Sequence, residues 1–392
     1  MNLDLDEATA AFQAQARAWL AENVPTTPLP SMDTAEGFAA HKEWEALLAE
    51  HRWSVVSWPR EYHGREASLL EWVVFEEEYY RSGAPGRVSQ NGIFLLAPIL
   101  FEHGTKEQQD RFLPSMATGE KVWAQAWSEP EAGSDLASIR SSAVRDDTAG
   151  GWRLNGQKTW SSRAAFADWG FGLFRSDPSA ERHRGLTYFL FPLDTEGVTV
   201  RPIAQLDGEP GFAEIFFDDV FVPDDDVLGA PGDGWRVAMS TAGNERGLSL
   251  RSPGRFCAAA DRLVDLWQHH RESRAREAAG AADRVVDAWI GAQAYRAYTW
   301  GTVTRLAAGG EIGAAGSVNK LFWSELDIAI HETALDLLGP ESELRGATAP
   351  AGGRWTDGYL FSLSGPIYAG TNEIQRNIVA ERVLGLPKEA RR

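Results

Sequence analysis

The spacing of apolar residues changes twice along this 392-residue chain, and that change limits the folds open to it. Apolar side chains recur at helical spacing in residues 7–21, 66–81, 235–270, 276–308 and 311–338. Between the second and third of these segments, short apolar stretches alternate with Gly, Asp, Asn and Pro, as strands and turns do. The sequence therefore predicts an α+β protein with strands between two helical parts.

Domain boundaries are predicted where the spacing changes. An N-terminal helical domain is expected over 1–120, a middle antiparallel β-domain over 121–233, and a C-terminal helical bundle over 234–392. The Pro-Gly-Asp-Gly stretch at 231–234 reads as a linker between the last two.

The charge balance excludes some partners. With 38 Lys and Arg against 56 Asp and Glu, the formal net charge is −18. Nucleic acids and anionic membranes reward clustered cations, so neither is an expected partner. The N-terminus is acidic and lacks a secretory pattern, and the longest apolar run (93–101) is far shorter than the ~20 residues of a membrane span. A cytoplasmic protein is expected.

Several common site types are also missing from the sequence. Cys257 is the only cysteine, so neither an intrachain disulfide nor a multi-thiolate metal site is expected. No pair of histidines has zinc-enzyme spacing, and we predict no metal site. The Gly-rich dinucleotide fingerprint, the P-loop and the nucleophile elbow are all absent.

Two polar clusters lie within the predicted β-domain. The stretch 127–135 (WSEPEAGSD) combines hydroxyls with a glycine and can offer donors to a phosphate or a heteroaromatic ring. The alternative is an ordinary turn with Asp135 as a cap. The stretch 155–162 (NGQKTWSS) begins with an Asn-Gly hairpin signal and ends with an aromatic beside two hydroxyls. Its alternative is a plain hairpin with Trp160 buried.

A third cluster lies near the C-terminus. The stretch 368–385 contains a flexible Ala-Gly pair before a predicted helix, which either Thr371 or Asn372 can cap. A helix N-terminus suits an anion or a polarised oxygen, although a simple capped helix explains the pattern equally well.

In this order and spacing, SEPEAGSD, NGQKTWSS and YAGTNEIQRNIVAERVLGLP resemble the motifs of the acyl-CoA dehydrogenase family. The resemblance covers nearly the whole chain. It implies FAD lying between the β-domain and the C-terminal helices, with an acyl-CoA thioester along the flavin.

The resemblance also implies roles for individual residues. Two positions, 128 and 162, carry Ser where the family commonly has Thr, and the hydroxyl is retained. The implied cofactor-binding residues are Trp127 and Ser128 at the pyrimidine side of the flavin, Gly133 and Ser134 at phosphate and ligand contacts, Trp160 and Ser162 beside the ring and its N5, and Thr371 and Glu373 in the last motif. Ser134 is also an implied substrate contact.

The catalytic base needs a different position from the one most common in the family. Many members have Glu directly after the Tyr of the last motif, whereas this chain has Ala369, whose backbone N–H can donate to the thioester oxygen but cannot abstract a proton. The resemblance implies Gly370 as the neighbouring substrate contact. A subset of the family places the base on the helix that opens the third domain. Glu245 is thereby implied as the base and Arg246 as a ligand contact. The alternative for Glu245 is a first-turn acid after Asn244 that stabilises the helix dipole.

Two motifs that support a neighbouring subunit's FAD have diverged. An Arg-x-x-Phe-Gly stretch is not recognisable in 270–300, and a Gln-x-x-Gly-Gly-x-Gly stretch is reduced to the Leu-Leu-Gly-Pro at 337–340. This divergence fits a heterotetramer with a related chain, as in members resembling actinobacterial steroid side-chain dehydrogenases. A diverged homotetramer is the other reading.

The activity implied by the resemblance is FAD-dependent α,β-desaturation of an acyl-CoA in fatty acid or steroid degradation. A base takes the α-proton, flavin N5 takes the β-hydride, and an electron-transfer flavoprotein accepts the electrons. Two alternatives are a flavin oxidase or monooxygenase on the same fold and a non-catalytic subunit of a heteromer. The sequence leaves open the acyl chain (straight, branched or steroid) and the choice between CoA and an acyl-carrier protein.

Overall fold

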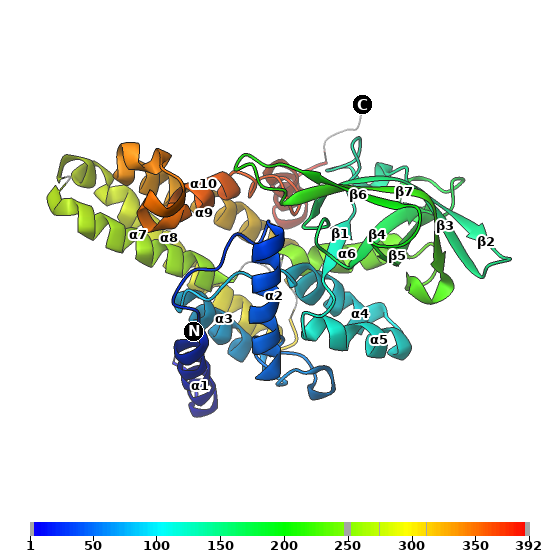
Figure 1. The fold of residues 1–392 in the computed structure, drawn as a ribbon, viewed down its shortest axis with the longest axis horizontal. Coiled ribbons are helices and arrows are strands. Elements are labelled where there is room, and N and C mark those ends of the chain that lie inside the picture. Colours follow the sequence, from blue (N-terminus) through cyan, green and yellow to red (C-terminus); the bar gives the residue numbers. More distant parts are fainter. Residues whose placement is uncertain (1–3, 247–251, 274, 311, 389–392) are drawn as a thin grey trace. The chain divides into compact units, whose positions relative to one another are not determined.

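The fold was analysed in a computed structural model that describes residues 4–246, 252–273, 275–310 and 312–388 (Figure 1). It contains two compact units, and each is described by itself. The helical unit comprises Met1–Val24, Ser68–Ala84 and Arg246–Arg392, and the β unit comprises Pro25–Ala67 and Pro85–Glu245.

The β unit is built on one sheet with the strand order β6-β7-β3-β2-β4-β5-β8 (Figure 1). The strands are β1 (Trp123–Ala126), β2 (Ser142–Asp146), β3 (Gly151–Ser162), β4 (Trp169–Arg175), β5 (Leu186–Pro192), β6 (Val198–Ile203), β7 (Phe212–Pro223) and β8 (Val227–Leu228). Most neighbours are antiparallel, whereas β1 and β2 each pair with β4 in parallel. Apolar side chains from several strands form the core, including Leu154, Phe174, Phe191 and Ile215.

Helices precede and follow this sheet: α2 (Ala35–Glu50), α4 (Ala97–His103), α5 (Lys106–Ala117) and α6 (Gly234–Arg246). Thr105 caps α5 and forms a capping box with Gln108. On α6, Thr241 is buried and its hydroxyl lies 3.4 Å from the Tyr188 hydroxyl of β5, so this helix is tied to the sheet.

The Asn-Gly hairpin prediction at 155–156 is wrong. Asn155 and Gly156 lie inside the long strand β3, and β2 and β3 are joined instead by residues 147–150. Gly156 has φ of 139°, and a Cβ there would lie 2.3 Å from Ser141 Oγ. Asn155 Oδ1 accepts a hydrogen bond from the Asp219 N–H. The glycine therefore allows close approach within the sheet and does not reverse the chain.

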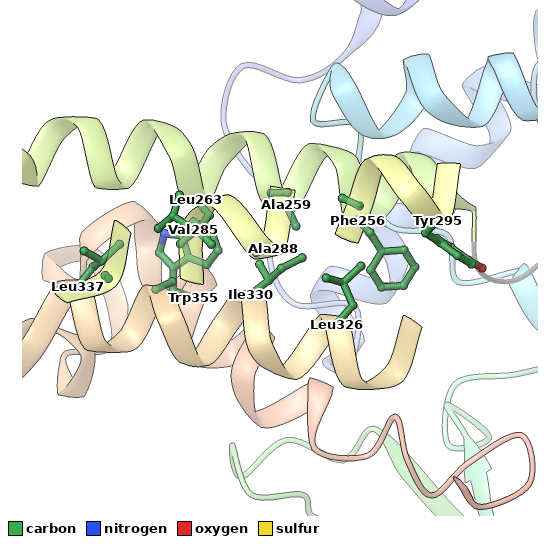
Figure 2. Close-up of a cluster of buried hydrophobic side chains, with 14 of the residues drawn as sticks. Phe256, Ala259, Leu263, Val285, Ala288, Tyr295, Leu326, Ile330, Leu337 and Trp355 are labelled. Carbon is green, nitrogen blue, oxygen red and sulfur yellow. The ribbon is translucent and has the colours of Figure 1, made fainter. Parts of the chain in front are cut away.

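The helical unit contains α1 (Glu7–Asn23), α3 (Leu69–Arg81), α7 (Pro253–Ser273), α8 (Ala275–Ala307), α9 (Gly316–Leu338), α10 (Arg354–Ser362) and α11 (Asn372–Ile378). Buried acids on α3 join its parts: Glu78 pairs with Arg17 of α1 at 2.8 Å, and Glu77 pairs with Arg296 of α8 at 2.7 Å. The core combines α7 to α10, and Figure 2 shows Leu263, Val285 and Trp355 converging from three of these helices.

The predicted fold class is confirmed, with helices before and after a central sheet. The segment predicted as 235–270 is described as two helices, and Pro253 opens the second because its fixed φ and missing N–H suit a first helical turn. Domain boundaries at 120/121 and 233/234 stay a prediction. None of the helices in the described ranges is long and apolar enough to cross a membrane.

Candidate active site

The loop that follows β1 carries the first predicted cluster. Glu129 and Ala132 exchange backbone hydrogen bonds of 3.0 Å, which closes a tight turn. The Thr159 N–H donates to the Ser128 carbonyl at 2.9 Å, which fastens the loop to β3. The first two predicted clusters are therefore neighbours in space as well as in sequence order.

Lys158 lies between the loop and the sheet and is fully buried. Its Nζ donates to Glu129 Oε1 at 2.8 Å, to the Leu173 carbonyl at 2.7 Å and to the Trp127 carbonyl at 3.3 Å. The Glu129 carboxylate also accepts from the Arg140 and Ser141 backbone N–H groups, at 2.6 and 2.9 Å. The Lys158–Glu129 ion pair is thus hydrogen-bonded to both the start and the end of the loop.

The electrostatics of this pair follow from burial and proximity. Burial lowers the pKa of the Lys158 ammonium to about 8, against the opposing attraction of Glu129. Burial alone would raise the pKa of Glu129, but Lys158 and the hydrogen bonds to the carboxylate hold that pKa below its ordinary value. Near neutral pH both groups carry their charges.

Trp160 departs from regular strand geometry. It has φ of 60°, and the pairing of β3 with β7 is irregular between Lys158 and Ser161. Its side chain is 60% exposed and meets Phe212 edge-on, with 5.9 Å between ring centroids. The alternative of a buried Trp160 is therefore wrong, because the bulge turns the indole out of the sheet.

Several polar atoms near these residues are buried without a hydrogen-bond partner in the described part of the chain: Gln125 Nε2, Trp127 Nε1 and Ser161 Oγ. They come from the end of β1, the following residue and the end of β3. A Cβ at Gly133 would meet nothing within 4 Å, so the protein's own packing does not require glycine there. Ser134 is exposed and Ser162 is half-buried.

In the helical unit, the turn before α11 carries the last predicted cluster. Ala369 and Gly370 both have positive φ, 57° and 78°. The Gln375 side-chain amide donates to both of their carbonyls, at 3.0 and 3.2 Å. The Ala369 N–H makes no backbone hydrogen bond within the described ranges. Of the two predicted caps Thr371 is correct, since its hydroxyl accepts from the Ile374 N–H.

A second buried lysine holds this turn. Lys320 of α9 is fully buried, and its Nζ donates to Asn372 Oδ1 at 2.7 Å. Asn372 also exchanges hydrogen bonds with the Ser324 hydroxyl. Glu373, in the first turn of α11, is 79% exposed and lies 4.0 Å from Arg376. Its carboxylate therefore faces outward in this unit.

Glu245 and Arg246 belong to α6, but their side chains lie outside the described residues. The body of this helix is tied to α4, because the Ser240 hydroxyl lies 3.0 Å from His103 Nε2 and donates to Glu102 at 3.2 Å.

Seven of the predicted residues thus belong to the β unit: Trp127, Ser128, Gly133, Ser134, Trp160, Ser162 and Glu245. Ala369, Gly370, Thr371 and Glu373 belong to the helical unit. Sequence reasoning assigned no role to Lys158, Glu129 or Lys320, although the first two lie inside the quoted motifs. Gln125 had a usable signal, since it is a polar residue within the apolar stretch that forms β1.

Comparison with known proteins now identifies the family. The models of the acyl-CoA dehydrogenase N-terminal, middle and C-terminal domains match residues 6–120, 124–220 and 232–384. Acyl-CoA dehydrogenase IpdE1 of Mycobacterium tuberculosis is 41% identical over 97% of this chain and 98% of its own length. This chain belongs to the acyl-CoA dehydrogenase family.

Solved structures of the family are similar throughout the chain. A chain of the ChsE4-ChsE5 complex from Mycobacterium tuberculosis has a TM-score of 0.86 at 26% identity, with both chains covered completely. A chain of the Tcur3481-Tcur3483 steroid acyl-CoA dehydrogenase has a TM-score of 0.85 at 25% identity, covering 99% of this chain and 100% of that one.

FAD is the cofactor of this family, and the residues of the β unit fit it. Buried donors without a partner suit the carbonyl and nitrogen acceptors of a flavin ring, and the open space at Gly133 suits a close approach. No group of three or more His, Cys, Asp or Glu side chains in the described ranges could hold a metal ion.

Proposed function

We propose that this acyl-CoA dehydrogenase desaturates an acyl-CoA thioester between its α and β carbons. The observation that carries the proposal is the cluster at the ends of β1 and β3. There, partnerless buried polar atoms lie in the segments that also carry the outward-turned indole of Trp160. A buried polar group without a hydrogen-bond partner costs about 1–3 kcal/mol. A bound flavin ring would supply the missing partners and so explains why these groups are present.

FAD would be held by the residues that the family motifs imply. In the β unit, Trp127 and Ser128 would contact the pyrimidine side, and Gly133 and Ser134 the phosphates. Trp160 and Ser162 would lie beside the ring, and Thr371 and Glu373 would be further cofactor contacts. When bound, FAD supplies an acceptor at N5 for the hydride that leaves the β carbon.

The chain itself would handle the α-proton and the thioester oxygen. The Ala369 N–H, which makes no backbone hydrogen bond of its own within the described ranges, would donate to the developing enolate oxygen. Ala369 has no ionisable group, so Glu245 of α6 would abstract the proton. Arg246 and Gly370, with Ser134, would contact the substrate.

Anaerobic flavin bleaching tests this assignment. The purified chain is mixed with straight, branched and steroid acyl-CoA thioesters, and the same panel is run with Glu245→Gln. We expect one class of thioester to bleach the flavin band. Glu245→Gln should lose at least about 100-fold in rate while keeping FAD, since general base catalysis contributes about 10²–10⁴-fold.

Glu332→Gln is the matched control, because it removes an exposed carboxylate of α9 that has no assigned part in the site, and it should bleach at the rate of the unchanged chain. Equal bleaching rates for Glu245→Gln and the unchanged chain would refute the base assignment. Rapid reoxidation of the bleached flavin by air would favour an oxidase or monooxygenase, and a chain that never retains FAD would favour a non-catalytic subunit.

We further propose a steroid acyl-CoA substrate and a related partner chain. The support is the likeness to a complex of two different chains and to a steroid acyl-CoA dehydrogenase. An apolar face on α8, formed by Val286, Trp289 and Ile290, is about half exposed and suits contact with the helices of a second family member. A homotetramer with full FAD occupancy, formed by this chain alone, would overturn the partner proposal.

An electron-transfer flavoprotein is proposed as the electron acceptor, and a cytoplasmic location stays a prediction. Steady-state reduction of such a flavoprotein, driven by the thioester, would test the acceptor. Presenting the same acyl group on an acyl-carrier protein would decide which carrier the site accepts.

A further inference from the structure

We propose that Lys158 and Glu129 are positioning residues that set the geometry of the FAD-facing loop. The inference rests on the proposed placement of FAD against Trp127, Ser128 and Trp160. The side chains of Lys158 and Glu129 are only 0% and 8% exposed, so neither offers a surface for direct contact with a ligand. They would act through the residues they hold.

The contacts of Lys158 join separate parts of the β unit. An ammonium has three N–H donors, and Nζ has three acceptors: the Trp127 carbonyl in the loop, the Glu129 carboxylate, and the Leu173 carbonyl of β4. Every donor is therefore committed to a defined direction. The first of these bonds fixes the peptide plane that follows Trp127, and hence the start of the loop.

The same pair also controls the far side of the loop and the indole opposite it. Glu129 accepts from the backbone N–H groups of Arg140 and Ser141, where the loop re-enters the sheet. Lys158 lies two residues before Trp160, at the edge of the irregular pairing with β7. One ion pair thus sets both segments that would enclose the flavin ring.

A buried ion pair such as Lys158–Glu129 is not explained by a net gain in the stability of the fold. Desolvating two charges costs about as much as their attraction returns, and well-packed apolar residues often replace a buried pair without loss. Directional hydrogen bonds, by contrast, fix a loop in a way that apolar packing does not. A role in loop geometry therefore accounts for the pair better than a role in stability.

The test separates positioning from stability. Lys158→Met leaves the buried Glu129 carboxylate without its cation and should lower the melting temperature. A second variant, Lys158→Met with Glu129→Gln, removes the unpaired charge and should restore most of the lost melting temperature. Asp226→Asn is the control, because Asp226 is a buried acid of the same unit, paired with Arg111 at 2.6 Å and assigned no part of the site. FAD dissociation constants and the visible circular dichroism of bound flavin are measured for all four proteins.

We expect FAD affinity to fall about tenfold or more in both Lys158 variants, with an altered flavin dichroism, because the bonds to Trp127 and Leu173 remain missing in both. The Asp226→Asn control should bind FAD with the affinity of the unchanged chain even if it melts earlier. Recovery of both FAD affinity and dichroism in the double variant would overturn the inference. Failure of the unchanged chain to bind FAD, both alone and beside a related partner chain, would instead refute the proposed function.

Discussion

Each unit contains a turn that carries predicted site residues, and the two turns are held by different chemistry. In the β unit, buried Lys158 holds the loop after β1 through the Glu129 carboxylate. In the helical unit, equally buried Lys320 holds the turn before α11 through the neutral amide oxygen of Asn372. Each unit also has a non-glycine residue at positive φ in its site segments, Trp160 and Ala369.

The difference teaches how sensitive each turn should be. A buried carboxylate that loses its cation, or the reverse, leaves an uncompensated charge in a medium that solvates it poorly. The amide oxygen of Asn372 carries no net charge, and it keeps the Ser324 hydroxyl as a donor when the lysine is removed. Substitutions at the lysine contacts of the loop in the β unit should therefore lower the free energy of unfolding more than those in the turn of the helical unit.

Glu129→Ala should have the largest effect on stability. It leaves the Lys158 ammonium without its carboxylate and the Arg140 and Ser141 N–H groups without an acceptor. Breaking a buried pair in this way costs about 3–5 kcal/mol, measurable by urea unfolding of the FAD-free chain. Glu131→Ala removes an exposed neighbouring acid and should change the free energy of unfolding by less than about 0.5 kcal/mol.

Lys320→Met should have a smaller effect. The change removes the donor to Asn372 and costs about 1–3 kcal/mol of unfolding free energy. The same urea experiment measures it. A loss equal to that of Glu129→Ala would show that charge does not distinguish the two turns.

Alkaline pH should act on Lys158 in a defined direction. Burial lowers the pKa of Lys158 to about 8 in the folded chain, whereas in the unfolded chain the pKa is near its ordinary value of 10.5. In that window the unfolded state binds more protons, so the contribution of Lys158 to stability rises with pH, by up to about 1 kcal/mol per pH unit. The free energy of unfolding is measured for the unchanged chain and for Lys158→Met at several pH values. The difference between the two proteins gives the contribution of Lys158, and a difference that falls with pH contradicts the expectation.

Thr371→Ala should have the smallest effect. It removes the hydroxyl that caps α11, which costs about 1 kcal/mol, and Thr371→Ser should keep nearly all of the stability. Thermal unfolding of the two variants gives the comparison. If both lose the same amount, the methyl group rather than the cap stabilises this turn.

Local patterns in the sequence predicted most of the fold. The helical spacing of apolar residues located α1, α3, α8 and α9. The Asn-Gly pair misled because its meaning depends on the strand that lies beside it: Gly156 is needed to let Ser141 approach. No local rule carries that information.

The site was predictable only in part for the same reason. Family motifs predicted Trp127, Trp160 and Ala369 as site residues, but not what holds them in place. The pairing of Lys158 with Glu129 spans 29 residues and that of Lys320 with Asn372 spans 52, so each depends on how strands or helices are brought together. The outward turn of Trp160 likewise follows from a register shift that the sequence alone does not reveal.

The assembly of the helical unit from separated segments has a consequence for synthesis. Glu77 of α3 receives its hydrogen bond from Arg296, which lies 219 residues later in the chain. At ribosomal rates of about 5–20 residues per second, α3 waits roughly 10–40 s for that partner. The segments of the β unit, which end at Glu245, emerge sooner. During this interval the apolar faces of α1 and α3 are not yet covered by the later helices of their unit. The rate of translation therefore determines how long this apolar surface is exposed to solvent.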